Sequence, residues 1–258
     1  MSSDPLDVLV VTGGHPFEAE PFFAVFDELG DIEWTAADEP GTGHDVVVLY
    51  DMPGLRFTRG DPPVELIEPT AAQRAVFDEL TAAGTGLVVL HHAIAGWPAW
   101  EGFATLVGGR FHYRPGHLDG VDYPDSGYRF DVTHTVEVLA PDHPVCRGLE
   151  PSFTITDELY CFPVLTDRVT PLMRTTFDTS DPSAFHSADL AIRGQRDRND
   201  GWTHPPGSDL VAWTRDVDRS RLVYLQFADG PVTYADPHFR RILSNALTWS
   251  ARRDPPTA

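Results

Sequence analysis

The chain has 258 residues, a length that fits one α/β domain with a large core. Its 39 acidic side chains outnumber its 19 basic ones, all of which are arginine, and the formal charge is −20. Because this charge repels phosphate backbones and anionic lipid, we expect neither nucleic acid nor a membrane as a partner. No apolar run approaches the roughly 20 residues that span a bilayer, and residues 1–5 do not resemble a signal peptide, so we expect a cytoplasmic protein.

Strands and helices alternate through the first half of the sequence. Short apolar runs predict buried strands, and apolar residues at helical spacing predict helices. The predicted strands cover residues 7–12, 32–35, 45–50 and 87–90, and the predicted helices cover 21–29, 70–83 and about 97–107. Strands joined by helices in this rhythm indicate right-handed crossovers and a doubly wound, mostly parallel sheet, which is an α/β fold.

The second half has a looser pattern. Further strands are predicted at residues 135–139, 171–176, 210–215 and 222–227, and a last helix at about 236–251. Residues 178–207 lack periodicity and are typical of a long surface excursion. Since no repeat and no clean linker interrupts the chain, we predict a single domain over residues 1–258.

Two adjacent histidines, His91 and His92, directly follow the buried strand 87–90. Ligands of open α/β sheets bind outside the carboxyl ends of the strands, so these side chains are candidates for a site. In extended geometry they would point to opposite faces, and one of them could be a core histidine. An imidazole in this place can act as a general acid or base, or bind a metal, when a carboxylate or carbonyl orients its other nitrogen.

Other side chains are candidates for binding a ligand. Gly14 and His15 follow the first strand in a turn that lacks the spacing of a dinucleotide fingerprint, so we expect His15 at the rim of a cleft. His112 or His117 could join His91 around a divalent metal, although their loop could equally be plain surface or a dimer contact. Four aromatic residues could stack on sugar rings or belong to the core, namely Trp97, Trp100, Tyr113 and Tyr160.

Several short motifs together carry a resemblance to a known family. They are His91 after its strand, Gly108–Phe111, Asp142–Val145 with Gly148–Leu149, Asp157–Tyr160, Val211–Trp213, and Asp236–Phe239 with Trp249. In this order the chain resembles the trehalose-utilization (ThuA-like) family from about Val8 to Trp249. The resemblance implies a flavodoxin-like fold similar to class I glutamine amidotransferases, and a link to trehalose and to sugars oxidised at the 3-position.

The resemblance places His91 where amidotransferases carry their catalytic cysteine. Neither Cys146 nor Cys161 follows a predicted strand in this way, so no thiolate can form a glutamyl thioester there, and we expect no glutaminase activity. It also favours Asp157 or Glu158 facing the site, whereas the residues alone would equally fit a helix N-cap beside a solvated acid. Asp229 stands where the family usually has a histidine.

Two classes of function remain. In the first, His91 and an acid from Asp157, Glu158 or Asp229 transfer protons beside a carbonyl, which describes a lyase, isomerase or hydrolase acting on an oxidised or trehalose-derived sugar. The second is a noncatalytic ligand-binding or scaffold protein. The expected partner is a small sugar ligand, with a homodimer as a further expectation. The predicted substrate-binding residues are Gly14, His15, His92, Trp97, His112 and Tyr160.

Overall fold

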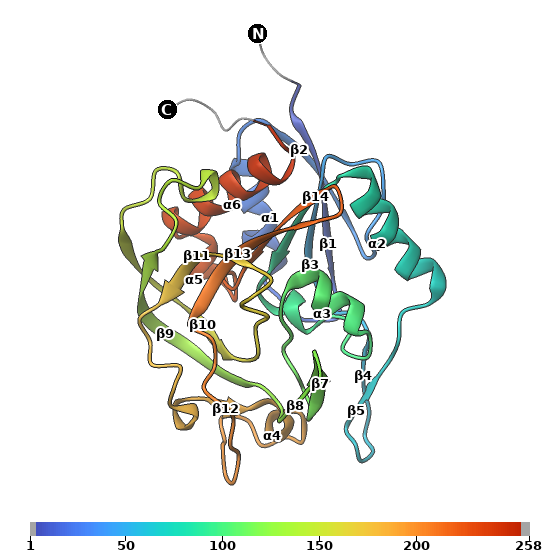
Figure 1. The fold of residues 1–258 in the computed structure, drawn as a ribbon, viewed down its shortest axis with the longest axis vertical. Coiled ribbons are helices and arrows are strands. Elements are labelled where there is room, and N and C mark those ends of the chain that lie inside the picture. The colour runs from blue at the N-terminus through green and yellow to red at the C-terminus, as the bar shows by residue number, and fades with distance from the viewer. Residues whose placement is uncertain (1–3, 254–258) are drawn as a thin grey trace.

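A five-stranded parallel unit forms the centre of the molecule in the computed structural model, which describes residues 4–253. Its strands lie in the order β2-β1-β3-β6-β14 (Figure 1). They are β1 (Leu6–Gly13), β2 (Ile32–Ala37), β3 (Val46–Asp51), β6 (Gly86–Leu90) and β14 (Ser220–Leu225). This is the strand order of flavodoxin-like proteins, so the predicted α/β fold class is confirmed.

Helices cover both faces of the parallel strands. They are α1 (Ala19–Glu28), α2 (Ala71–Ala83), α3 (Glu101–Val107), α5 (Pro231–Tyr234) and α6 (Pro237–Ser250). Alternate residues of β1 enter different cores: Val10 lies in the cluster that contains Phe22 of α1, and Val11 lies in the cluster that contains Phe77 of α2. Because both faces are buried, the parallel strands are apolar throughout, which made them visible in the sequence.

An antiparallel half extends the sheet beyond β14. It continues in the order β13 (Leu210–Val217), β11 (Thr170–Thr175), β9 (Gly127–Val138) and β10 (Ser152–Cys161), and β12 (His186–Ser187) also pairs with β9. The sequence predicted β11 and β13 but only the end of β9, and it missed β10. Residues 157–161 are buried on both faces, which hides the alternation of a strand. The alternative of an N-cap at Asp157 is therefore wrong.

Small elements gather at one end of the molecule, opposite the first residues of β1 (Figure 1). They include the hairpins β4 (Leu55–Phe57) with β5 (Val64–Leu66) and β7 (Gly116–Leu118) with β8 (Val121–Tyr123), and the helix α4 (Ala188–Ile192). Short 3-10 helices form at η1 (His91–Ala95), η2 (Pro144–Cys146) and η3 (Pro182–Ala184). Among residues 4–253, no helix has both the length and the apolar character required to cross a membrane.

Candidate active site

His91 lies where the chain turns from β6 into η1. Its backbone is left-handed, with a φ of 49°, a strained conformation for a residue with a side chain and one that sharp strand-to-helix turns impose on active-site residues. The imidazole is buried, and its Nδ1–H donates to the Gln226 carbonyl oxygen over 2.6 Å. This hydrogen bond leaves Nε2 as the nitrogen that faces other functional groups.

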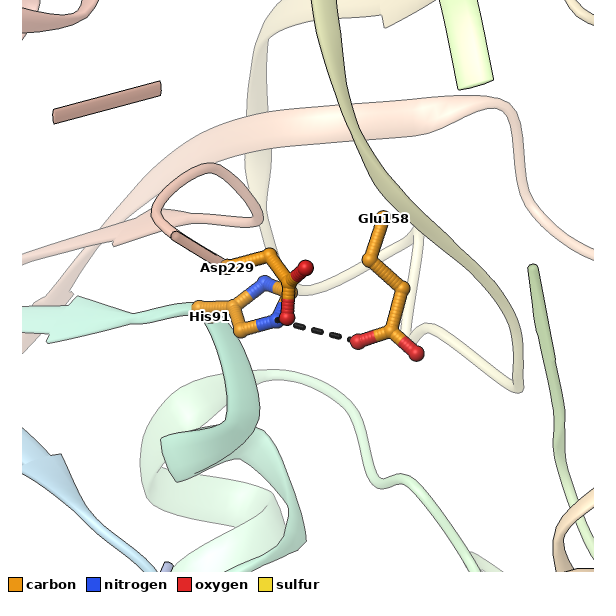
Figure 2. Close-up of side chains that lie close together, drawn as sticks. All are labelled: His91, Glu158 and Asp229. Atoms are coloured by element: carbon orange, nitrogen blue, oxygen red, sulfur yellow. Dashed lines mark hydrogen bonds and ion pairs between the residues drawn. The ribbon is translucent and has the colours of Figure 1, made fainter. Parts of the chain in front are cut away.

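Two carboxylates meet at Nε2 of His91. A Glu158 oxygen lies 3.1 Å away and an Asp229 oxygen 3.4 Å away, and Figure 2 shows the three side chains converging from separate segments of the chain. Glu158 belongs to β10, and Asp229 lies in the turn between β14 and α5. The Tyr160 hydroxyl oxygen is 2.8 Å from the same nitrogen. Glu158 and Tyr160 are two residues apart in a strand, so their side chains share one face.

The charges of this cluster shift the pKa values of its members in different directions. Burial lowers the pKa of His91, but the hydrogen bonds with Asp229 and Glu158 outweigh it and hold that pKa well above its usual value. Burial raises the pKa of Asp229, but the hydrogen bond with His91 outweighs it and the net shift is downward. For Glu158, burial dominates and the net shift of the pKa is upward. The cluster therefore holds a cation, a firmly ionised carboxylate and a carboxyl group that retains its proton more readily.

Asp157 points away from Glu158, since neighbouring residues of a strand face opposite sides. Its carboxylate accepts the backbone N–H groups of Ala228 and Asp229, over 2.8 and 3.0 Å. Ala228 has a left-handed backbone with a φ of 98°, so these bonds hold a strained turn in place. Burial raises the pKa of Asp157 to about 6. Asp157 is thus a positioning residue for the turn that presents Asp229.

A cavity of about 520 Å³ opens over the cluster, a size that suits a small-molecule ligand. Of the catalytic residues predicted from the sequence, Glu158 and Asp229 line it, whereas His91 lies beneath them and is only 1% exposed. Of the predicted substrate-binding residues, Gly14, His15, His92 and Tyr160 line it. A Cβ atom at Gly14 would collide with the Met52 carbonyl, which explains the glycine at this turn.

His15 and His92 form a stacked pair in the wall of the cavity, with ring centroids 4.2 Å apart. Burial lowers the pKa of both rings, and the neighbouring imidazoles lower it further, so both rings are neutral near pH 7. His92 donates its Nε2–H to the Tyr50 carbonyl over 3.0 Å, which leaves its Nδ1 as an acceptor. Nδ1 has no partner in either ring. Such acceptors suit the hydroxyl groups of a ligand.

Two predicted substrate-binding residues lie outside this cavity. Trp97 lines a separate space of about 90 Å³ beside Asp51 and Phe77. His112 is buried against the Tyr123 ring, because its backbone N–H donates to Ser126 and holds it toward the β7–β8 hairpin. Phe57, Phe111, Tyr128, Phe130, Ala188, Ala191, Ile192 and Arg196 line the cavity but were not found from the sequence, in which no periodicity links them.

A divalent cation could be held by His91, Glu158 and Asp229, whose ligand atoms lie within 4.8 Å of one another. Within residues 4–253 no other histidine, cysteine or acid joins this group. The expectation that His112 or His117 would join His91 is wrong, because His117 leaves with the β7–β8 hairpin and pairs with Asp122 over 2.9 Å. The separations at Nε2 are those of hydrogen bonds, which a shared proton explains without a metal.

Neither cysteine belongs to the cluster. Cys146 lies in η2 and Cys161 ends β10, and both are buried. Burial raises the pKa of each thiol to about 12, far from the range of a reactive thiolate. The turn after β6 carries His91 in the position where a nucleophile would stand, so the structure offers no thiolate for glutamine hydrolysis.

The fold and this cluster define a class of protein: a flavodoxin-like α/β domain with an imidazole and carboxylates at the carboxyl edge of its sheet. The family model described as "ThuA: Trehalose utilisation" matches residues 44–250. The chain therefore belongs to the ThuA family. No curated protein has a detectably similar sequence.

Solved structures show the same fold at low sequence identity. A protein described as ThuA-like from Parabacteroides merdae aligns with a TM-score of 0.68 and 15% identity, over 98% of this chain and 93% of that one. Another, from Bacteroides uniformis, aligns with a TM-score of 0.65 and 18% identity, over 99% and 97% of the two chains. A GMP synthase component from Thermoplasma acidophilum aligns with a TM-score of 0.52 and 14% identity, over 97% and 96%. The amidotransferase-like fold is therefore confirmed.

Proposed function

We propose that the protein is an enzyme of sugar catabolism that transfers protons at a carbon atom next to the carbonyl group of an oxidised sugar. The observation that carries this proposal is the pair Glu158 and Asp229, which lines the cavity and whose pKa values shift in opposite directions beside buried His91. Carboxyl groups whose pKa values are pushed apart supply a base and an acid in one site at one pH.

The chemistry follows from these protonation states. The Asp229 carboxylate removes a proton from the carbon next to the carbonyl, and the electron pair of the C–H bond forms an enolate. When the enolate collapses, the carbonyl is restored, a carbon–carbon double bond forms, and the C–O bond of the leaving group breaks. Glu158 gives its proton to the departing oxygen. His91 contacts both carboxyl groups and can return the proton from Asp229 to Glu158, which restores the starting state.

A sugar as substrate is supported by two independent features. The family model that matches the chain is described by trehalose utilisation. The stacked rings of His15 and His92 present unpaired acceptor nitrogens at the cavity, where hydroxyl groups of a sugar could donate. A glycoside oxidised at the 3-position meets the chemical requirement, because its carbonyl acidifies the C2–H bond and its glycosidic oxygen is the leaving group.

The proposal is tested by turnover of 3-keto-glucosides. We expect Asp229→Asn and Glu158→Gln each to lower kcat by about 10²- to 10⁴-fold, the usual contribution of a general acid or base. Asp218→Asn is the matched control, because it makes the same change in the exposed β13–β14 turn, at the opposite end of β14. Wild-type protein that binds 3-keto-glucosides without converting them would contradict the proposal and favour a noncatalytic binding protein.

A further inference from the structure

The cavity has two chemically different ends. Its polar end contains His15, His92, Glu158 and Asp229, of which His92 and Glu158 are buried. The other end is a wall of aromatic and aliphatic side chains, which we call the apolar wall; it consists of Phe57, Phe111, Tyr113, Tyr128, Phe130, Ala188, Ala191 and Ile192. Phe57 and Phe130 are 54% and 37% exposed, so this wall reaches the mouth of the cavity.

The rings of the apolar wall form contiguous groups. The Tyr113 ring makes edge contacts with Phe57 and Phe111, with centroids 6.3 and 5.3 Å apart, and the Tyr128 ring contacts Phe130 at 5.2 Å. Phe111 also contacts Tyr160, at 4.8 Å, and Tyr160 reaches the Nε2 atom of His91. The apolar wall therefore begins at the catalytic cluster and continues outward, so one ligand could contact both.

The hydroxyl groups of this wall already have partners. Tyr113 donates to the Met52 sulfur over 3.4 Å. The Tyr128 oxygen accepts the backbone N–H of Asp197 over 2.9 Å and donates to the Asp197 carboxylate over 3.4 Å. Arg196, with its guanidinium 5.7 Å from the centre of the Phe130 ring, is the charged side chain at this end. A second sugar ring would bring several hydroxyl groups to a wall with few free partners, which is unfavourable for binding.

We propose that the apolar wall binds an aromatic aglycone, so that the substrate is an aryl glycoside oxidised on its sugar. This inference rests on the proposed function, because the catalytic cluster must act on the sugar end. An aromatic group would bury its faces and edges against Phe57, Tyr113 and Phe130 and needs no hydrogen-bond partners there. A phenol is also a better leaving group than a sugar hydroxyl, which fits the elimination at the catalytic cluster.

Binding of unoxidised glucosides tests the substrate class without turnover, because these ligands lack the carbonyl. Phenyl glucoside, methyl glucoside of the same anomer, and trehalose are titrated calorimetrically into the wild-type protein. We expect the phenyl glucoside to bind about tenfold more tightly than the methyl glucoside, and more tightly than trehalose, because an aromatic ring adds a large apolar contact. Trehalose binding as tightly as the phenyl glucoside, or no binding of any glucoside, would overturn the inference.

Variants of the apolar wall locate the contact. Phe130→Ala and Phe57→Ala should each reduce the preference for phenyl over methyl glucoside to about threefold or less, while Phe130→Leu keeps more of it. Leu139→Ala is the matched control, because Leu139 is also exposed, at 41%, and does not line the cavity. An unchanged preference in a folded Phe57→Ala/Phe130→Ala double variant would contradict the inference. Failure of the proposed function appears separately, as aryl-selective binding without turnover of keto-glucosides.

Discussion

Replacement of His91 by glutamine removes the only cation of the catalytic cluster while keeping a hydrogen-bond donor there. The Nε2 atom lies 3.1 Å from Glu158 and 3.4 Å from Asp229. At an effective dielectric constant of about 20, a charge pair at such a distance attracts by about 5 kcal/mol. Desolvation of the buried groups offsets part of this attraction, and loss of one partner from a buried pair costs about 3–5 kcal/mol. We therefore expect His91→Gln to lower the free energy of unfolding by about 3–5 kcal/mol.

Urea unfolding followed by circular dichroism at pH 7 measures this loss. The control is His44→Gln, which removes an imidazole 3.0 Å from the exposed carboxylate of Asp7. A surface pair of this kind contributes about 0–1 kcal/mol, so the control should change stability little. The catalytic turnover of His91→Gln should also fall, because the proton can no longer return from Asp229 to Glu158. A loss of stability no larger than that of His44→Gln would refute the placement of a buried imidazolium between two carboxylates.

Three further predictions follow from the protonation states. Because the folded-state pKa of His91 is raised, the folded protein holds an extra proton, whose stabilisation is complete below about pH 6.5 and is lost as pH rises through the folded pKa; between pH 7 and 9 wild-type stability should fall by up to about 1.4 kcal/mol per pH unit more than that of His91→Gln, and equal slopes would contradict this. The protein should release no ammonia from glutamine above a blank, and release abolished by Cys146→Ser or Cys161→Ser would show the opposite. A chelator should leave keto-glucoside turnover intact, whereas added Zn²⁺ should inhibit it by competing with the proton on Nε2, and loss of turnover after chelation, restored by metal, would show a metal-dependent site instead.

The parallel half of the fold could be predicted because each of its strands is buried on both faces. The run from Leu87 to Leu90 is apolar without interruption, and a strand of this kind leaves a site residue at its carboxyl end. His91 was found by this reasoning alone. The same logic did not show that its imidazole lies below the cavity, since that depends on which segments fold over the strand end.

The remainder of the site depends on contacts between distant parts of the chain. Glu158 reaches His91 only because the antiparallel extension brings β10 back to the end of β6, and no local pattern records that pairing. The family resemblance, rather than periodicity, drew attention to Asp157 and Glu158. Phe57 comes from a hairpin and Ile192 from a five-residue helix, so the apolar wall has no signature in the sequence.

Exchange of a carbon-bound proton with solvent tests the central claim most directly. A 3-keto-glucoside is incubated with the protein in D₂O, and the C2–H signal is followed by proton NMR beside a blank without protein. The account predicts that wild-type protein accelerates loss of this signal and that Asp229→Asn exchanges at the rate of the blank. Wild-type exchange no faster than the blank, or exchange by Asp229→Asn at the wild-type rate, would contradict the assignment of Asp229 as the base.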